Sequence, residues 1–196
     1  AVLRRALTEE PEHPEALQLL AETLTSTEQW DALAQILQQQ AWSFGTDDAT
    51  RAWLQLGRLY SEELHDDAKA ETAWEAARRL LPGSLEATTA LRQVAARRHD
   101  RDKEIELLDE ESRLVTQPQQ RIALLMQLAA HVEADDPTRA MRLFKQVVDV
   151  NSHDVGARLG MIRVGMELGD WGTVVNLGTR LAQEIKGQPE HRWVLQ

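Results

Sequence analysis

The stretch from residue 53 to residue 82, WLQLGRLYSEELHDDAKAETAWEAARRLLP, decides the fold of this chain. Its apolar and small residues recur every three or four positions, which is the spacing of one face of an α-helix. They form two groups: Trp53, Leu56, Gly57 and Tyr60, followed by Ala70, Trp74, Ala77 and Pro82. Because a mostly polar segment separates the groups and a proline ends the second, the stretch predicts two helices joined by a turn.

Weaker copies of this pattern lie on both sides of the stretch. The upstream copy has Leu17, Leu20, Ala21 and Leu24, then Trp30, Leu33 and Leu37. A downstream copy has Leu125, Leu128, Ala129 and Val132, then Ala140, Phe144, Val147 and Ser152. The weakest copy, residues 85–115, keeps Leu91, Ala95, Ile105 and Leu108. Recurrence of the same pattern along the chain indicates a repeat protein. In such a protein each helix pair buries its apolar stripe against the next pair.

The pattern resembles the tetratricopeptide repeat (TPR) family, whose 34-residue repeat reads W-x2-L-G-x2-Y, then A-x3-F, then P. In residues 53–82 Trp74 replaces the phenylalanine, and one extra residue separates the two halves. The resemblance implies an all-α fold, a right-handed superhelical solenoid of helix-turn-helix repeats, with about ten or eleven helices and no strand.

The resemblance covers nearly the whole chain as a single TPR-like segment. We expect a half-repeat at 1–13, repeats at about 14–46, 47–84, 85–118, 119–153 and 154–188, and the start of a further helix at 189–196. The chain lacks an initiator methionine, and both ends fall inside a helical pattern. We therefore expect a segment of a larger multi-repeat protein, and the arginine-rich composition suggests a bacterial one.

Charge and composition exclude several classes of protein. Lysine and arginine number 22 against 32 aspartates and glutamates, so the net charge is −10 and nucleic acid is not an expected partner. The chain has no cysteine, which excludes disulfide scaffolds and thiolate chemistry. No apolar stretch is long enough to span a membrane. These features leave the compartment open, with a slight preference for the cytoplasm.

No pattern of catalytic or metal-binding residues stands out. The six histidines lie singly at turns and helix ends, without the H-E-x-x-H spacing of a zinc site. The acidic pairs Asp47-Asp48, Asp66-Asp67 and Asp135-Asp136 are expected in turns of successive hairpins, where they solvate the chain or cap helices. We expect Asp31, Asp48 and Asp136 to cap helix starts. Phosphate-binding and nucleophile-elbow motifs are also missing. We predict that the protein is not an enzyme and binds no cofactor or metal.

The aromatic residues divide into two kinds. Trp30, Trp53, Trp74 and Trp171 occupy repeat positions at which we expect buried or half-buried packing between helices. Trp42 and Phe44 follow the helical pattern of residues 30–40, at a place that the repeat does not reserve for aromatic residues. They either cover the helix end or form an exposed apolar contact.

The resemblance also implies where a partner would bind, because first helices line a concave groove in such proteins. The best repeat has Leu54 and Arg58 where the carboxylate-clamping members of the family have lysine and asparagine, which argues against that clamp. The candidate peptide-binding residues on this face are Leu54, Arg58, Gln93, Arg97, Met126, Leu159, Arg163 and Met166, and the same register adds Gln18, Glu22, Thr89 and Glu133.

The predicted function is that of a scaffold or adaptor that binds a peptide or helix of a partner protein. The mixture of arginine and apolar residues favours a peptide with acidic and aliphatic side chains. Alternatively, the arginines form ion pairs with acidic neighbours such as Glu22, Glu62 or Glu133. Two other roles remain open: a regulatory or sensor region of a larger enzyme or transcription factor, and weak self-association through the repeat ends. The apolar residues expected at those ends are Val2, Leu3 and Leu7, and Trp193, Val194 and Leu195.

Overall fold

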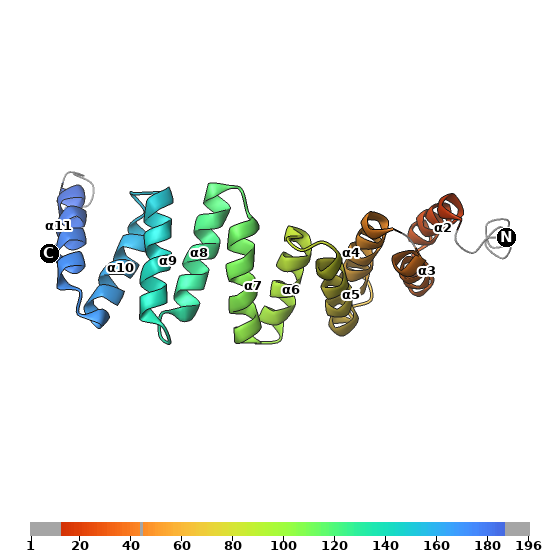
Figure 1. Cartoon of the computed structure of the whole chain (residues 1–196), viewed down its shortest axis with the longest axis horizontal. Coiled ribbons are helices and arrows are strands. Elements are labelled where there is room, and N and C mark those ends of the chain that lie inside the picture. Colours follow the sequence, from red (N-terminus) through yellow and green to blue (C-terminus); the bar gives the residue numbers. More distant parts are fainter. Residues whose placement is uncertain (1–12, 44, 187–196) are drawn as a thin grey trace. The chain divides into compact units, whose positions relative to one another are not determined.

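The computed structural model describes residues 13–43 and 45–186 and is helical in every element of that range. Figure 1 labels the helices. They are α2 (Pro14–Ser26), α3 (Trp30–Ser43), α4 (Thr46–Glu62), α5 (Asp67–Leu80), α6 (Leu85–Arg97), α7 (Arg101–Leu114), α8 (Pro118–Val132), α9 (Pro137–Val150), α10 (Val155–Leu168) and α11 (Trp171–Lys186). The prediction of an all-α fold is confirmed, and the described residues contain no strand.

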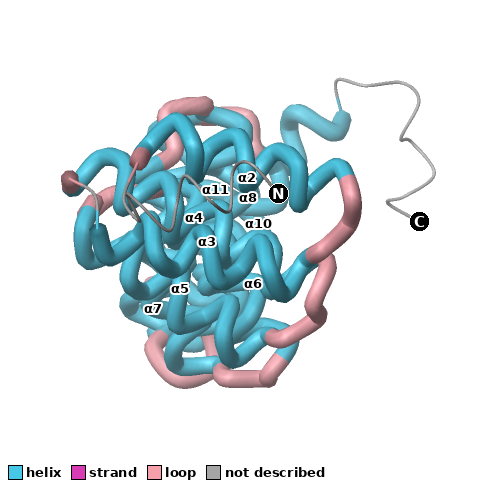
Figure 2. The backbone as a smooth tube through the Cα atoms, turned by 90° about the vertical axis from the view of Figure 1, so that its right-hand side faces the viewer, coloured by secondary structure: helices cyan, strands magenta, loops and turns pink. Residues whose placement is uncertain are grey.

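The chain divides into two compact units, residues 1–107 and residues 108–196, with the division inside α7. In the first unit, each helix from α2 to α6 packs against the next one in sequence. In the second unit the same is true from α8 to α11. Short loops join these helices, as Figure 2 shows in pink between the cyan helices. Each unit is thus a stack of helical hairpins.

Aspartate and serine side chains start several of the helices. Asp66, Ser84, Asp136 and Asp154 each accept a hydrogen bond from the backbone N–H three residues ahead, at distances of 2.8–3.3 Å. Asp136 was predicted to cap a helix, and this is confirmed.

The same prediction was wrong for two other aspartates. Asp31 and Asp48 lie in the first turns of α3 and α4, one or two residues inside the helix. There they still interact favourably with the positive end of the helix dipole.

Four of the hairpin turns share one backbone feature, a residue with a positive φ angle, which the turn between α8 and α9 lacks. Glu28, His65 and His99 have φ angles of 54°, 50° and 57°, and Gly169 has 72° in the corresponding turn between α10 and α11. This left-handed region favours glycine, because a Cβ crowds the backbone there. The three non-glycine turns therefore carry local strain.

Close approach between helices organises both cores. In the first unit Gly57 of α4 faces Trp74 of α5, and a Cβ on Gly57 would lie 2.5 Å from Cδ1 of that indole. In the second unit Gly160 of α10 faces Phe144 of α9, and a Cβ there would lie 2.5 Å from Cζ of the ring. Trp74 and Phe144 are both buried. In each case one helix supplies the aromatic ring and the other supplies the space for it.

Three of the four tryptophans expected in the packing are where they were predicted. Trp53 and Trp74 are buried and Trp30 is half-buried. The prediction was wrong for Trp171, which is 63% exposed. Trp171 is the first residue of α11, and the face of that helix that packs on α10 begins three residues later, with Val174 touching the Gly165 position.

Of Trp42 and Phe44, which were predicted either to cover the helix end or to form an exposed contact, the structure describes only Trp42. Trp42 is 78% exposed at the end of α3, and its ring makes a T-shaped contact with the ring of Trp53, with the centroids 5.4 Å apart. It therefore covers part of the buried Trp53 while presenting most of its own surface to solvent. Phe44 lies outside the described residues.

Replacing Gly57 with alanine should destabilise the chain, although alanine is the better helix former. The new methyl group would overlap the Trp74 indole, so we expect a loss of roughly 1–3 kcal/mol in the free energy of unfolding. Gly178→Ala is the matched control, because a Cβ at Gly178 meets nothing within 4 Å. There alanine should stabilise α11 by about 0.5–1 kcal/mol. Urea denaturation of both variants checks the prediction, and a stabilised Gly57→Ala would contradict it.

Replacing His99 with glycine should stabilise the chain. The change relieves the left-handed strain at this turn, offset in part by the added freedom of the unfolded chain, and we expect a gain of about 0.5–1 kcal/mol. His153→Gly serves as the control, because His153 does not have a positive φ. The readout is the midpoint of urea denaturation. A lower midpoint for His99→Gly would show that the turn is not strained.

Candidate functional site

A groove of about 890 Å³ lies in the first unit between α2, α3 and α4. The first helices of two successive hairpins, α2 and α4, form its sides, and α3 lies between them in sequence and packs against both. The lining residues are Gln18, Ala21, Glu22, Thr25 and Ser26 from α2, Leu33, Leu37 and Gln40 from α3, and Asp48, Arg51, Ala52, Gln55, Arg58 and Leu59 from α4.

The groove has an apolar floor and a polar rim. Leu33, Leu37, Ala52 and Leu59 are buried, so they form the floor. Most of the other lining residues are polar or charged and exposed. A concave surface with this division can receive apolar side chains below and hold polar backbone groups above.

The charges on the rim are already paired. Gln18 donates a hydrogen bond of 3.1 Å to Glu22 within α2. Arg51 lies 2.8 Å from Asp48 within α4. Arg58 donates a hydrogen bond of 2.6 Å to Glu86 at the start of α6, so it links the first helices of two hairpins. This bond raises the pKa of Arg58.

Gln55 differs from these rim residues. It is exposed and lies one helical turn from both Arg51 and Arg58, and no hydrogen bond joins its amide to another residue of the described ranges. A glutamine side chain offers one acceptor and two donor hydrogens, which match the backbone groups of an extended peptide.

The structure places the predicted residues of the first unit in different surroundings. Arg58 lies on the groove rim, whereas Leu54 is half-buried and packs against the core cluster. Gln93 is exposed on α6. Arg97 forms two hydrogen bonds to Asp67, of 3.2 Å from Nε and 2.5 Å from Nη2. Only Arg58 of these four lines the groove, together with Gln18 and Glu22 from the same predicted face.

In the second unit, α10 presents the predicted residues most openly. Leu159 and Met166 are each about half exposed on this helix. Arg163 between them is bound to Glu133 at the end of α8 through two hydrogen bonds, one of them 2.7 Å long. The bonds lower the pKa of Glu133 and raise that of Arg163. Met126 is half-buried, and its methyl group lies 3.3 Å from the position of a Cβ on Gly156.

All three predicted arginines thus have carboxylate partners. Arg163 pairs with Glu133, as the alternative interpretation proposed, whereas Arg58 and Arg97 pair with Glu86 and Asp67 rather than with the glutamates named there. Arg58 and Arg97 are about half exposed, and Glu86 and Asp67 are each 37% exposed, so these two pairs are worth little to stability. Arg58 and Arg97 could each exchange the carboxylate for one on a partner at small cost, whereas Glu133 is only 17% exposed.

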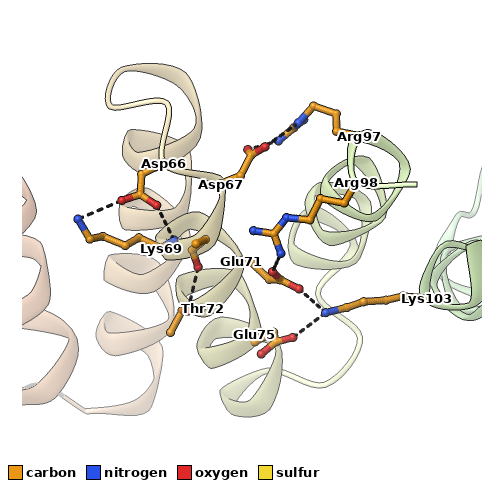
Figure 3. A network of polar contacts seen from close by, with 10 residues as sticks. Asp66, Asp67, Lys69, Glu71, Thr72, Glu75, Arg97, Arg98 and Lys103 are labelled. Atoms are coloured by element: carbon orange, nitrogen blue, oxygen red, sulfur yellow. Dashed lines mark hydrogen bonds and ion pairs between the residues drawn. The ribbon is translucent and has the colours of Figure 1, made fainter. Parts of the chain in front are cut away.

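A second set of charges joins α5 to the helices that follow it, as Figure 3 shows. Glu71 accepts hydrogen bonds from both Arg98 and Lys103, and Lys103 also binds Glu75 at 2.9 Å. The hydrogen bond from Lys103 is the main reason that the pKa of Glu71 lies below its usual value. These residues tie α5 to α6 and α7, so we interpret them as a structural network.

The described residues offer no metal site and no membrane span. Residues 13–43 and 45–186 contain no group of three or more histidine, aspartate or glutamate side chains that could hold a metal ion. No helix within the same ranges is both long and apolar enough to cross a membrane.

Two groove residues of α4, Arg51 and Gln55, were missed in the sequence, although their spacing from Arg58 could have revealed them. Arg51, Gln55 and Arg58 stand at i, i+4 and i+7 and therefore share one face of α4. The prediction took Leu54 and Arg58 from the family register instead. Leu33 and Leu37 were identified as core residues, but their second role as groove floor depends on the space left between α2 and α4.

Acid should weaken the Glu71 network. Because the folded-state pKa of Glu71 is lowered, its contribution to stability is present above the ordinary carboxylate pKa of 4.5. That contribution is lost as the pH falls through the folded-state value. We expect Glu71→Gln to lower the urea midpoint at pH 7, and to lower it progressively less as the pH falls below 4.5. Exposed Glu63→Gln is the control for loss of a charge. A deficit of Glu71→Gln that does not vary with pH would contradict this account.

Comparison with known proteins supports the fold. No known family model matches the sequence, and no curated protein matches it. The crystal structure of MamA protein has a TM-score of 0.51 at 11% identity, covering 90% of this chain and 93% of that one. The MamA RS-1 ArsTM double mutant has a TM-score of 0.50 at 12% identity, covering 89% and 96%. MamA 41-end from Desulfovibrio magneticus RS-1 gives 0.49 at 12% identity, covering 89% and 96%. The helices of the described residues, together with the two likenesses at TM-scores of 0.51 and 0.50, show a TPR-like helical-repeat fold.

Proposed function

We propose that this chain is a TPR-family protein-interaction module, and that its first unit binds an extended segment of a partner protein in the groove between α2 and α4. The observation that carries the proposal is the groove itself, with its volume of about 890 Å³, its leucine floor and its polar rim. That volume falls in the usual range for sites that hold small ligands or a few side chains. The proposal assigns no catalytic step to the site.

The floor favours aliphatic side chains in the bound segment. Leu33 and Leu37 come from α3, and Ala52 adds only a methyl group from α4, so the bottom of the groove is apolar. Burying one leucine-sized side chain there would contribute about 1.5–3 kcal/mol. One or two such residues would supply most of the affinity of a transient interaction.

The rim favours a segment that also carries a carboxylate. Arg51 and Arg58 stand on the same side of the groove, each with an exposed partner that an incoming carboxylate can replace. Gln55 between them is available to the backbone of the segment. Glu22 and Asp48 on the rim disfavour a segment with several acidic residues close together. We therefore propose one carboxylate beside an aliphatic residue.

The predicted residues of the second unit belong to the same proposal as a separate contact surface. Leu159 and Met166 offer exposed apolar surface on α10, and the Arg163–Glu133 pair lies between them. This arrangement repeats the combination of an arginine with apolar neighbours. We propose that it binds aliphatic and acidic side chains of a partner independently of the first unit.

A selection from a random peptide display library tests the groove. The peptides enriched on the wild-type chain are measured by fluorescence anisotropy against Gln55→Trp, which fills the groove from an exposed rim position. We expect affinity to fall at least about tenfold, which corresponds to 1.4 kcal/mol. Arg58→Glu should select against peptides that carry a carboxylate while leaving uncharged peptides bound.

The control for the first variant is Gln127→Trp. Gln127 is exposed on α8, at the position of that helix that corresponds to Gln55 of α4, but it lies in the other unit. It should leave the affinity of groove peptides unchanged. If Gln55→Trp and Gln127→Trp bind the enriched peptides as well as the wild type does, the groove is not the binding site.

A further inference from the structure

The three arginines of the predicted binding face differ in how much of each guanidinium is bonded. Arg97 uses Nε and Nη2 together on a single carboxylate, as Figure 3 shows, and Arg163 uses the same two nitrogens on one carboxylate. Arg58 uses Nε alone, in the hydrogen bond of 2.6 Å to Oε1 of Glu86. In the part of the chain that the structure describes, neither Nη1 nor Nη2 of Arg58 has a hydrogen-bond partner. Arg58 can therefore donate to a second carboxylate while it keeps the first.

Glu86 holds Arg58 from outside the groove. Arg58 lines the groove, whereas Glu86 is not among the lining residues and comes from the first turn of α6, in the next hairpin. The hydroxyl of Ser84 caps this helix, and the positive end of the helix dipole offsets part of the negative charge of Glu86. The hydrogen bond therefore restrains the side chain of Arg58 without adding a carboxylate to the groove lining.

The other arginine of the rim, Arg51, is held in a different way. Its Nη2 lies 2.8 Å from Oδ1 of Asp48 in the same helix, and Asp48 itself lines the groove. A carboxylate that approached Arg51 would also meet the negative charge of Asp48, and like charges brought together oppose binding. Arg58 has its carboxylate partner outside the groove. Of the two arginines, Arg58 is thus the better site for an acidic side chain.

We propose that Glu86 is a positioning residue of the groove. It holds Arg58 through Nε so that Nη1 and Nη2 bind the carboxylate of the partner segment, and it stays in place when the segment binds. This inference rests on the proposed function, because it needs a segment in the groove. It adds that the carboxylate lies at Arg58 rather than at Arg51, and that its affinity depends on a residue of the next hairpin that does not touch the segment.

The reason for this arrangement is the cost of ordering a long side chain. An incoming carboxylate could replace Glu86, but it then has to immobilise Arg58 by itself. Immobilising one side chain with many rotamers weakens binding by about twofold to tenfold. A carboxylate that binds beside Glu86 avoids this loss, because Arg58 is already held.

A matched pair of peptides tests the proposal. One is a display-selected peptide that carries a single glutamate, and the other has glutamine in its place. Fluorescence anisotropy gives both dissociation constants, and their ratio measures the preference for the carboxylate. We expect the wild type to prefer the glutamate peptide at least about tenfold. Glu86→Ala should reduce this preference at least about threefold and leave the affinity for the glutamine peptide unchanged, which also shows that the variant is folded.

Two further variants separate the position of Arg58 from the charge around it. Glu86→Gln keeps an oxygen that accepts the hydrogen bond from Nε, so it should retain at least the wild-type preference. Glu62→Ala is the matched control. The pKa of Arg58 is raised mainly by the hydrogen bond to Glu86 and to a smaller degree by the charge of Glu62, and no hydrogen bond joins Glu62 to Arg58 in the described residues. Removing Glu62 should not lower the preference.

A double variant shows whether Glu86 acts through Arg58. Arg58→Gln should abolish the preference for the glutamate peptide. In that background Glu86→Ala should have no further effect, because the side chain that it positions is gone. A reduction that persists without Arg58 would overturn the proposal.

Two other results would also overturn it. If Glu86→Ala and Glu86→Gln both raise the affinity for the glutamate peptide, Glu86 competes with the segment and does not assist it. If Glu86→Ala keeps the wild-type preference, or weakens both peptides equally, Glu86 does not position Arg58 for the carboxylate. These failures leave the groove itself intact, because the glutamine peptide still loses affinity with Gln55→Trp. If Gln55→Trp weakens neither peptide, the proposed function fails as well.

Discussion

The structure depends on close contact between neighbouring helices, in which a glycine on one helix leaves room for an aromatic ring on the other. Gly57 lets α4 meet the Trp74 indole, and Gly160 lets α10 meet the Phe144 ring. A side chain at either glycine would force the helices apart, because protein interiors leave no spare volume of that size. The two contacts are not identical in position. The first joins the helices of one hairpin, and the second joins successive hairpins, so the same pair of residue sizes serves both steps of the stack.

Helix spacing also creates the groove that we propose as a binding surface. Where α2 and α4 stand on either side of α3, their exposed faces leave a groove whose floor is Leu33 and Leu37. The floor residues stabilise the fold and form the apolar part of the site at once. Substitutions on the rim would leave the packing of the core unchanged, because residues such as Arg51 and Gln55 are exposed. A fold of this kind therefore separates stability from specificity, which suits a binding module more than an enzyme that must fix several groups in one place.

The helices and most of the core could be predicted from the sequence because they follow from helical spacing alone. Trp53, Leu56 and Trp74 were expected in the core and are buried there. The prediction failed for Trp171, whose repeat position resembled that of a packed residue although it is the first residue of its helix. The lining of the candidate groove was predicted only in part. Arg58 followed from the register, but the roles of Gln55 and the partners Glu86 and Asp67 depend on distances between helices, which a single sequence does not contain.

The central claim of this account is that a partner segment lies between α2 and α4, over the leucines of α3. The most direct measurement is a crystal structure of the chain bound to a peptide selected for affinity. The account predicts peptide density in the groove, with an aliphatic side chain against Leu33 and Leu37 and the peptide backbone beside Gln55. Density for the peptide on another surface, with this groove filled only by water, would contradict it.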